Sequence, residues 1–192
     1  AFKTREISIP SAGQYLWAES ALIEKWQLVL ASSHTLRVGL IWSAGARSAT
    51  GGRRSIDLDY LAPLLADSRV RWISLQLPPQ SEQISRLPEG TCLDLSALQP
   101  NMCETGAIIM GLDLVITVDT SIAHLAGALG CPVWVMLPHV PDWRWQLHRE
   151  DSPWYDSMRL FRQRATGDWP SVVEALSVAL NQRMSAAAPP AV

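Results

Sequence analysis

The sequence has little net charge, few cysteines and no long apolar run, and each shortage excludes a class of protein. Sixteen Lys and Arg oppose 18 Asp and Glu, and this net charge of −2 argues against broad binding to nucleic-acid backbones. Three widely spaced cysteines, Cys92, Cys103 and Cys131, fit neither a disulfide framework nor a zinc site. No run approaches the roughly 20 apolar residues that span a bilayer. With no signal-peptide pattern at its start, the chain is expected in the cytoplasm.

Short apolar runs alternate with helical periodicity through most of the 192 residues. Strands are predicted at 37–42, 70–77, 92–95, 113–118, 132–137 and 158–162. Helices are predicted at 19–31, 57–67, 81–86, 103–111, 120–129 and 168–182. Apolar strands that are each followed by a helix predict an α/β fold, a doubly wound (Rossmann-like) parallel sheet of about six strands with helices on both faces. Residues 1–17 are interpreted as a linker or N-terminal extension, 18–183 as one domain and 184–192 as a disordered tail.

Ligands of an open parallel sheet bind beyond the carboxyl ends of its strands, and the loop after the first predicted strand is suited to an anion there. Ser43 and Gly45 are small and let a ligand approach the backbone, and Arg54 is one of three arginines that can neutralise phosphate. The loop matches neither a dinucleotide fingerprint nor a P-loop, which disfavours NAD and ATP. A solvated loop without a ligand is the alternative.

The fourth strand ends in Asp119, Thr120 and Ser121 and runs directly into a helix. A helix N-terminus offers free N–H groups and partial positive charge, which suits a pyrophosphate. Asp119 would repel phosphate, so it is expected to cap the helix or orient a neighbour. His124 follows one turn later and either contacts a phosphate and stabilises a leaving group or faces the core as a satisfied histidine. An ordinary capped helix explains the segment equally well.

Residues 138–157 form a long loop that contains Asp142, Trp143 and Trp145. Loops of this length in a compact domain are usually functional, and these rings either stack on a base or sugar or cover one end of the sheet. Asp57 and Asp59 form an Asp-x-Asp pair that is interpreted as helix capping. No cluster has metal-ligand spacing, so no metal is expected.

Two long segments resemble known glycosyltransferases. Residues 118–134 resemble the donor-site segment of glycosyltransferases related to the lipopolysaccharide heptosyltransferases. Residues 141–145, followed by 149–155 and 158–162, resemble the C-terminal region of bacterial proteins that join tetratricopeptide repeats to such a region. The shorter segments 38–43, 54–55 and 74–76 fit the same pattern, and the resemblance extends over residues 15–180.

The resemblance implies one lobe of a GT-B architecture, in which the C-terminal lobe holds a nucleotide-diphosphate sugar. The residues expected beside the donor diphosphate are Ser43, Gly45, Arg54, Asp119, Thr120, Ser121 and His124. The expected surroundings of the nucleotide and sugar are Gln76, Glu104, Thr105, Asp142, Trp143 and Trp145. The donor is a substrate, and neither a cofactor nor a metal is implied. The general base is expected in an N-terminal lobe, so this chain alone should be inactive.

Two positions depart from the pattern of the heptosyltransferases. Ser121 and Ile122 stand where Gly-Pro is usual, and the first loop has arginine in place of a frequent lysine. The alternatives are therefore a degenerate GT-B-like module for binding or scaffolding, or another GT-B enzyme such as a nucleotide-sugar epimerase. The partners expected are the N-terminal lobe or a tetratricopeptide-repeat region. A cleft or the N-terminal lobe would cover Trp143, Trp145 and Trp154, which would otherwise form an exposed apolar patch.

Overall fold

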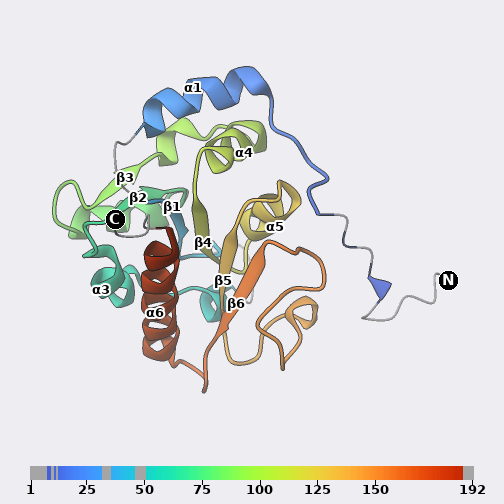
Figure 1. Ribbon diagram of the computed structural model, residues 1–192. Coiled ribbons are helices and arrows are strands. Elements are labelled where there is room, and N and C mark those ends of the chain that lie inside the picture. The colour runs from blue at the N-terminus through green and yellow to red at the C-terminus, as the bar shows by residue number, and fades with distance from the viewer. Residues whose placement is uncertain (1–7, 10, 12, 32–35, 46–50, 188–192) are drawn as a thin grey trace, which may run out of the picture.

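The computed structural model describes residues 8, 9, 11, 13–31, 36–45 and 51–187, and its centre is one six-stranded sheet (Figure 1). The strands are β1 (Leu36–Ile41), β2 (Val70–Ser74), β3 (Cys92–Asp94), β4 (Leu114–Val118), β5 (Val133–Leu137) and β6 (Met158–Arg162). All neighbouring strands are parallel, in the order β3-β2-β1-β4-β5-β6. This sheet confirms the predicted α/β class and the number of strands.

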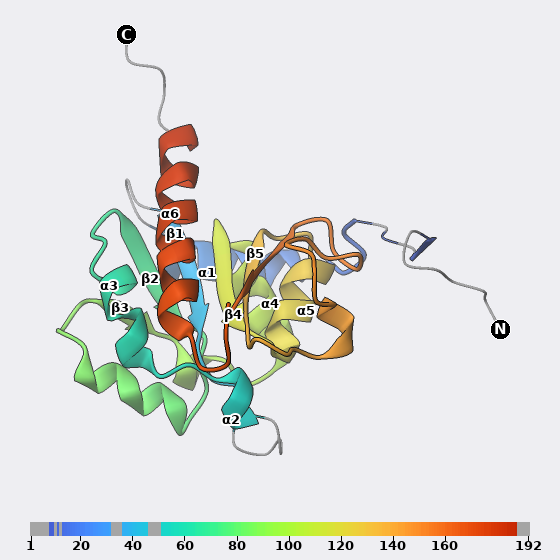
Figure 2. The same ribbon diagram turned by 90° about the horizontal axis from the view of Figure 1, so that it is seen from below.

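Helices cover both faces of the sheet, as Figure 2 shows from below. The helices are α1 (Ser20–Leu30), α2 (Gly51–Arg54), α3 (Ala62–Leu65), α4 (Met102–Met110), α5 (Ser121–Ala128) and α6 (Trp169–Ala187). Helices α1, α4 and α5 share one hydrophobic core with one face, and α3 and α6 share another core with the opposite face. The two separate cores confirm that the sheet is doubly wound. None of the described helices combines the length and apolarity needed to cross a membrane.

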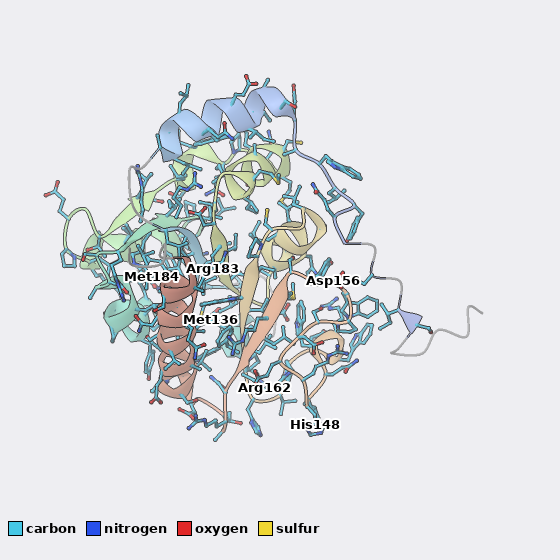
Figure 3. All side chains as sticks on the ribbon, in the orientation of Figure 1. Met136, His148, Asp156, Arg162, Arg183 and Met184 are labelled. Atoms are coloured by element: carbon cyan, nitrogen blue, oxygen red, sulfur yellow. The ribbon has the colours of Figure 1, made fainter. Side chains whose placement is uncertain are left out.

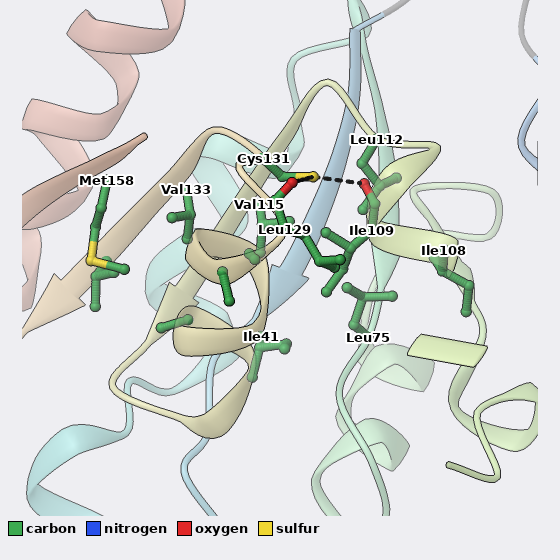
Figure 4. Packing of buried hydrophobic residues seen from close by; sticks show 14 of the residues in the cluster. Ile41, Leu75, Ile108, Ile109, Leu112, Val115, Leu129, Cys131, Val133 and Met158 are labelled. Atoms are coloured by element: carbon green, nitrogen blue, oxygen red, sulfur yellow. Dashed lines mark hydrogen bonds between the residues drawn. The ribbon is translucent and has the colours of Figure 1, made fainter. Parts of the chain in front are cut away.

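Side chains of each strand alternate between the two cores because successive residues of a strand point to opposite faces. In β4, Leu114 and Ile116 enter the core under α6, while Val115 enters the core under α4 and α5. Figure 4 shows the second of these cores, where Cys131 packs against Ile109. All five residues of β4 are buried, which explains why this strand appears as a continuous apolar run in the sequence.

The three cysteines differ in burial, since Cys131 is buried, Cys92 is partly buried and Cys103 is exposed. Cys92, Cys103 and Cys131 are all free thiols. Burial raises the pKa of the Cys92 thiol to about 12 and that of Cys131 to about 11, so both stay protonated near neutral pH. Within the part of the chain that the structure describes, no group of three or more His, Cys, Asp or Glu side chains could hold a metal ion.

The predicted helix at 57–67 is wrong as a single element. Asp57 accepts a hydrogen bond from the Asp59 N–H and caps a 3-10 turn, Leu58–Leu61, and α3 starts afresh behind it. The cause is Pro63, which has no N–H to donate back into the preceding turn. The capping role predicted for Asp57 is confirmed.

The carboxyl end of the domain also differs from the prediction. Helix α6 continues through Ala187, so residues 184–187 are helical and not a disordered tail, while 188–192 lie outside the described residues. A run of Ser and Ala has enough helix propensity to extend the helix. In the predicted linker, the N–H groups of Tyr15 and Leu16 both donate to the Ala128 carbonyl at 3.0 Å, so this part is anchored to the end of α5. Residues 1–7, 10 and 12 lie outside the described residues.

Candidate functional site

The strand order reverses between β1 and β4, and the loops that leave these strands diverge there. A cavity of about 320 Å³ opens at this point, bounded by the loops after β1 and β2 and by the beginnings of α4 and α5. Its polar lining includes Ser43, Gln76, Asn101, Thr105, Thr120 and Ser121, and its apolar lining includes Leu77, Pro78, Met102 and Ile122. No charged side chain of the described residues lines it. We call it the neutral cavity.

The wall on the β1 side is built around the buried side chain of Gln76. Its Oε1 accepts hydrogen bonds from the Ser43 N–H at 2.8 Å and the Trp42 N–H at 3.2 Å, which ties the ends of β1 and β2 together. The Ser43 hydroxyl lies 3.2 Å from that of Ser55. Gly45 has φ +75°, a left-handed conformation that favours glycine, and nothing lies within 4 Å of the position a Cβ would occupy. The loop therefore exposes backbone to the cavity.

The amino end of α5 forms the opposite wall, and Thr120 caps it. The Thr120 hydroxyl accepts from the Ile122 N–H at 3.3 Å and lies 3.0 Å from the Thr117 hydroxyl. Because Thr117 donates its own proton to the Val118 carbonyl, Thr120 must be the donor in the pair. Thr120 thus acts as an ordinary helix cap, which was the alternative interpretation of this segment. The exposed Ser121 carries the hydroxyl that can still donate to a ligand.

A second cavity of about 340 Å³, here called the charged cavity, lies on the other side of this helix end. Its charged lining is Arg53, Arg54, Arg144, Asp119 and Asp142. Arg54 donates through one terminal nitrogen to the Asp119 carbonyl oxygen at 3.0 Å and to its carboxylate at 3.3 Å. Asp119, only 2% exposed, therefore orients Arg54, one of the two roles expected for it.

The long loop supplies the outer wall of the charged cavity. Asp142 accepts from the Arg144 N–H and pairs with its guanidinium, both at 3.1 Å, which caps the turn Trp143–Trp145. The two rings point in different directions, since Trp143 is 73% exposed and Trp145 is fully buried. The half-buried Trp154 meets Trp143 edge to face, with ring centroids 6.2 Å apart. The expected exposed patch of three tryptophans is therefore reduced to the exposed ring of Trp143.

Four of the predicted residues line neither cavity: Trp143 and Trp145, whose rings are described above, and His124 and Glu104. The Nδ1 atom of His124 lies 3.1 Å from the Tyr155 hydroxyl, and its ring stacks on Trp145 with centroids 5.2 Å apart. His124 is thus the satisfied histidine of the alternative interpretation. Glu104 faces α1, where it pairs with Lys25 at 2.9 Å and accepts from the indole N–H of Trp26.

Sequence reasoning missed several lining residues. Asn101 and Met102 border the neutral cavity, and Arg144 borders the charged cavity together with Arg53, one of the three loop arginines noted in the sequence. The signal for Asn101 was available, because it follows the third strand at the same carboxyl edge as the other loops. Nothing in the residue types around position 144 separated this arginine from an ordinary surface arginine.

The stability of the chain should decrease as the pH falls below about 6.5, the pKa of a histidine in an unfolded chain. Burial lowers the pKa of His124, and the charge of Arg144 lowers it further, while Asp119 and Asp142 oppose the shift. Below about 6.5 the unfolded chain then takes up the proton more readily than the folded one, and above it this contribution to stability is complete. Urea unfolding of the wild type and of His124→Asn at about pH 7.5 and 5.5 measures the effect. If the free energy of unfolding changes with pH by the same amount in His124→Asn as in the wild type, the pH dependence comes from other groups.

The sequence matches no protein-family model. It is 26% identical over 179 residues to Protein FlbA of Caulobacter vibrioides, a match that covers 90% of this chain and 30% of FlbA. The structure is similar to E. coli ADP-heptose lipopolysaccharide heptosyltransferase II, with TM-score 0.64 and 18% identity over 92% of this chain and 57% of that one. It is also similar to a glycosyl transferase of family 9 from Veillonella parvula, with TM-score 0.67 and 11% identity over 90% and 54% of the two chains.

A third similar structure is E. coli heptosyltransferase WaaC with ADP-2-deoxy-2-fluoro heptose, with TM-score 0.53 and 19% identity over 94% and 51% of the two chains. At these identities the likeness establishes the fold. The chain therefore has the Rossmann-like α/β fold of GT-B glycosyltransferase lobes, as the sequence resemblance implies. It spans less than a third of FlbA and about half of each of these transferases.

Proposed function

We propose that this chain is the donor-binding lobe of a GT-B glycosyltransferase and that it holds a nucleotide-diphosphate sugar. The observation that carries the proposal is the order of three features along the carboxyl edge of the sheet. The neutral cavity, the amino end of α5 and the charged cavity follow one another there, with Thr120 and Asp119 side by side at the junction. A base, a diphosphate and a sugar follow one another in the same order.

The nucleoside is assigned to the neutral cavity. Its volume of about 320 Å³ falls at the lower end of the range for ligand pockets. Met102, Ile122 and Leu77 offer apolar surface to a base, and the Asn101 and Gln80 side chains offer amide groups for hydrogen bonds. Of the residues expected around the nucleotide and sugar from the sequence, Gln76 and Thr105 line this cavity.

The diphosphate is assigned to the amino end of α5. The helix supplies partial positive charge, Ser121 supplies a hydroxyl, and the open backbone at Gly45 faces it from the β1 loop. Arg53 and Arg54 border the charged cavity beyond this point. As the bond between sugar and diphosphate breaks, these positive groups would stabilise the negative charge that develops on the leaving group. The proposal involves no metal and no cofactor.

The sugar is assigned to the charged cavity, where Asp119, Asp142 and Arg144 can exchange hydrogen bonds with hydroxyl groups. Attack by an acceptor on the anomeric carbon needs a general base, which we assign to an N-terminal lobe in a longer protein that also includes a tetratricopeptide-repeat region. The present chain alone is then expected to bind donor without transferring it. Its three free cysteines support a cytoplasmic location.

Calorimetric titration of the 192-residue chain tests the proposal. UDP, GDP, ADP and their sugar derivatives are compared with the matching nucleosides, and one diphosphate series is expected to bind at least about tenfold more tightly than its nucleoside. Failure of every diphosphate to bind at millimolar concentration would contradict the proposal. Hydrolysis of a bound nucleotide sugar by this chain alone would contradict the assignment of the base to another lobe.

A further inference from the structure

A third cavity, of about 390 Å³, lies along the outer edge of β6, between that strand, the loop at 147–150 and the first half of α6. We call it the edge cavity. Its charged lining is Arg149, Arg159, Arg162, Arg164 and Glu150, and His148 is beside them. Figure 3 shows Arg162 at the end of β6 and His148 on the neighbouring loop. The edge cavity shares no lining residue with the neutral or the charged cavity.

The ion pairs around the edge cavity do not neutralise all of its arginines. Arg149 forms a two-point pair with Asp151, at 2.8 and 2.7 Å. Arg159 lies 3.7 Å from Glu150. Arg149 and Arg159 thus each have a carboxylate partner, whereas neither Arg162 nor Arg164 has one among the described residues, which leaves these two positive charges unpaired by a carboxylate there. In a chain of net charge −2 this surplus is local.

The positive charge of Arg162 is unfavourable in its surroundings. Its side chain is half-buried, and one terminal nitrogen donates to the Trp145 carbonyl at 3.1 Å. The other terminal nitrogen is buried and finds no hydrogen-bond partner in the described part of the chain. Burial lowers the pKa of this guanidinium, because a cation that leaves water without a counter-ion is destabilised. An anion in the edge cavity would supply the missing charge.

We propose that the edge cavity binds the phosphoryl group of a small phosphorylated molecule. A phosphate dianion matches the two unpaired charges, and guanidinium groups bind its oxygens with a geometry that suits them. The cavity also reaches Ser171, the third residue of α6, but the Asp168 carboxylate caps this helix end by accepting from the Ser171 N–H at 3.2 Å, so the attraction for an anion comes from the arginines. This site does not depend on the donor site proposed above.

Inorganic phosphate is the probe, and backbone amide shifts of the 192-residue chain are followed by nuclear magnetic resonance at constant ionic strength. Saturable shifts are expected at residues 148–150 and 159–164. The double variant Arg159→Ala/Arg164→Ala, which changes two exposed side chains, should weaken this binding at least tenfold, whereas Arg86→Ala, an exposed arginine outside the edge cavity, should leave it unchanged. Acetate at equal ionic strength should bind more weakly than phosphate.

Other outcomes would overturn the proposal. Shifts confined to the amino end of α5 and to Arg53 would place phosphate in the donor site alone. An equal loss of binding in Arg86→Ala would show general attraction to positive charge. Arg162→Gln keeps a donor to the Trp145 carbonyl and removes the buried charge, so a Gln variant that folds and binds phosphate as the wild type does would also refute the role of Arg162.

Discussion

Replacing Trp145 by alanine should lower the free energy of unfolding by about 3–5 kcal/mol, the usual cost of deleting a large buried aromatic side chain. Trp145 is fully buried, stacks on His124 and belongs to the core under α4 and α5. Tyr155, another buried ring of this loop, already packs against His124, so it cannot fill the cavity left by alanine unless the loop moves. Urea unfolding followed by circular dichroism measures the change.

Trp143 provides the matched control two residues away in the same turn. It is 73% exposed, so Trp143→Ala should change stability by less than about 0.5 kcal/mol. Trp145→Phe should cost less than Trp145→Ala, because it keeps a ring against His124 and removes an indole N–H that is buried without a partner among the described residues. Equal losses from the alanine variants at positions 143 and 145 would contradict the assignment of one ring to the core and the other to the surface.

Replacing Ser121 by aspartate should weaken the binding of a nucleoside diphosphate at least about 100-fold, since two like charges 4 Å apart repel by about 4 kcal/mol at an effective dielectric constant of 20. Ser121 is the first residue of α5, at the helix end to which we assign the diphosphate, and it also lines the neutral cavity. An acidic residue at this position stabilises the helix by about 0.3–1 kcal/mol, so the loss of affinity should come without a loss of stability. Calorimetry and thermal unfolding of the same samples separate the two effects.

Ser121→Asn is the control, because it has nearly the size of aspartate and no charge. It should bind the diphosphate within about tenfold of the wild type. Thr120→Ala is a weaker test, since it also removes the cap of α5 and costs about 1 kcal/mol of stability. If Ser121→Asp binds as tightly as Ser121→Asn, the diphosphate does not lie at the amino end of α5.

The sheet could be predicted from the sequence because its central strands are buried on both faces and appear as continuous apolar runs, as β4 and β5 show. The start of α5 was predictable for a similar local reason, since Thr120 is a residue type that caps helices. The helix at 57–67 failed where Pro63 interrupts the helical hydrogen bonds. Helices and strands were thus predictable where the residue types within the segment itself determine its structure.

The site was predictable only in part, because the direction of a side chain depends on what packs around it. The strand-end rule located Ser43, Thr120 and Ser121 correctly at one edge of the sheet. It gave no information about His124, whose direction is decided by Trp145 and by a tyrosine 31 residues away in the chain. Glu104 is turned from the cavity in the same way by residues of α1.

The most direct measurement locates a bound nucleoside diphosphate on the molecule. In a nuclear magnetic resonance titration of the 192-residue chain with the tightest-binding diphosphate, the largest amide shifts are expected at Ser43, Gly45, Asn101 and Ser121, around the neutral cavity and the end of α5. The edge cavity at 148–150 and 159–164 should respond less. Saturable binding whose largest shifts lie away from the carboxyl edge of β1 and β4 would contradict the proposal that this chain is a donor-binding lobe.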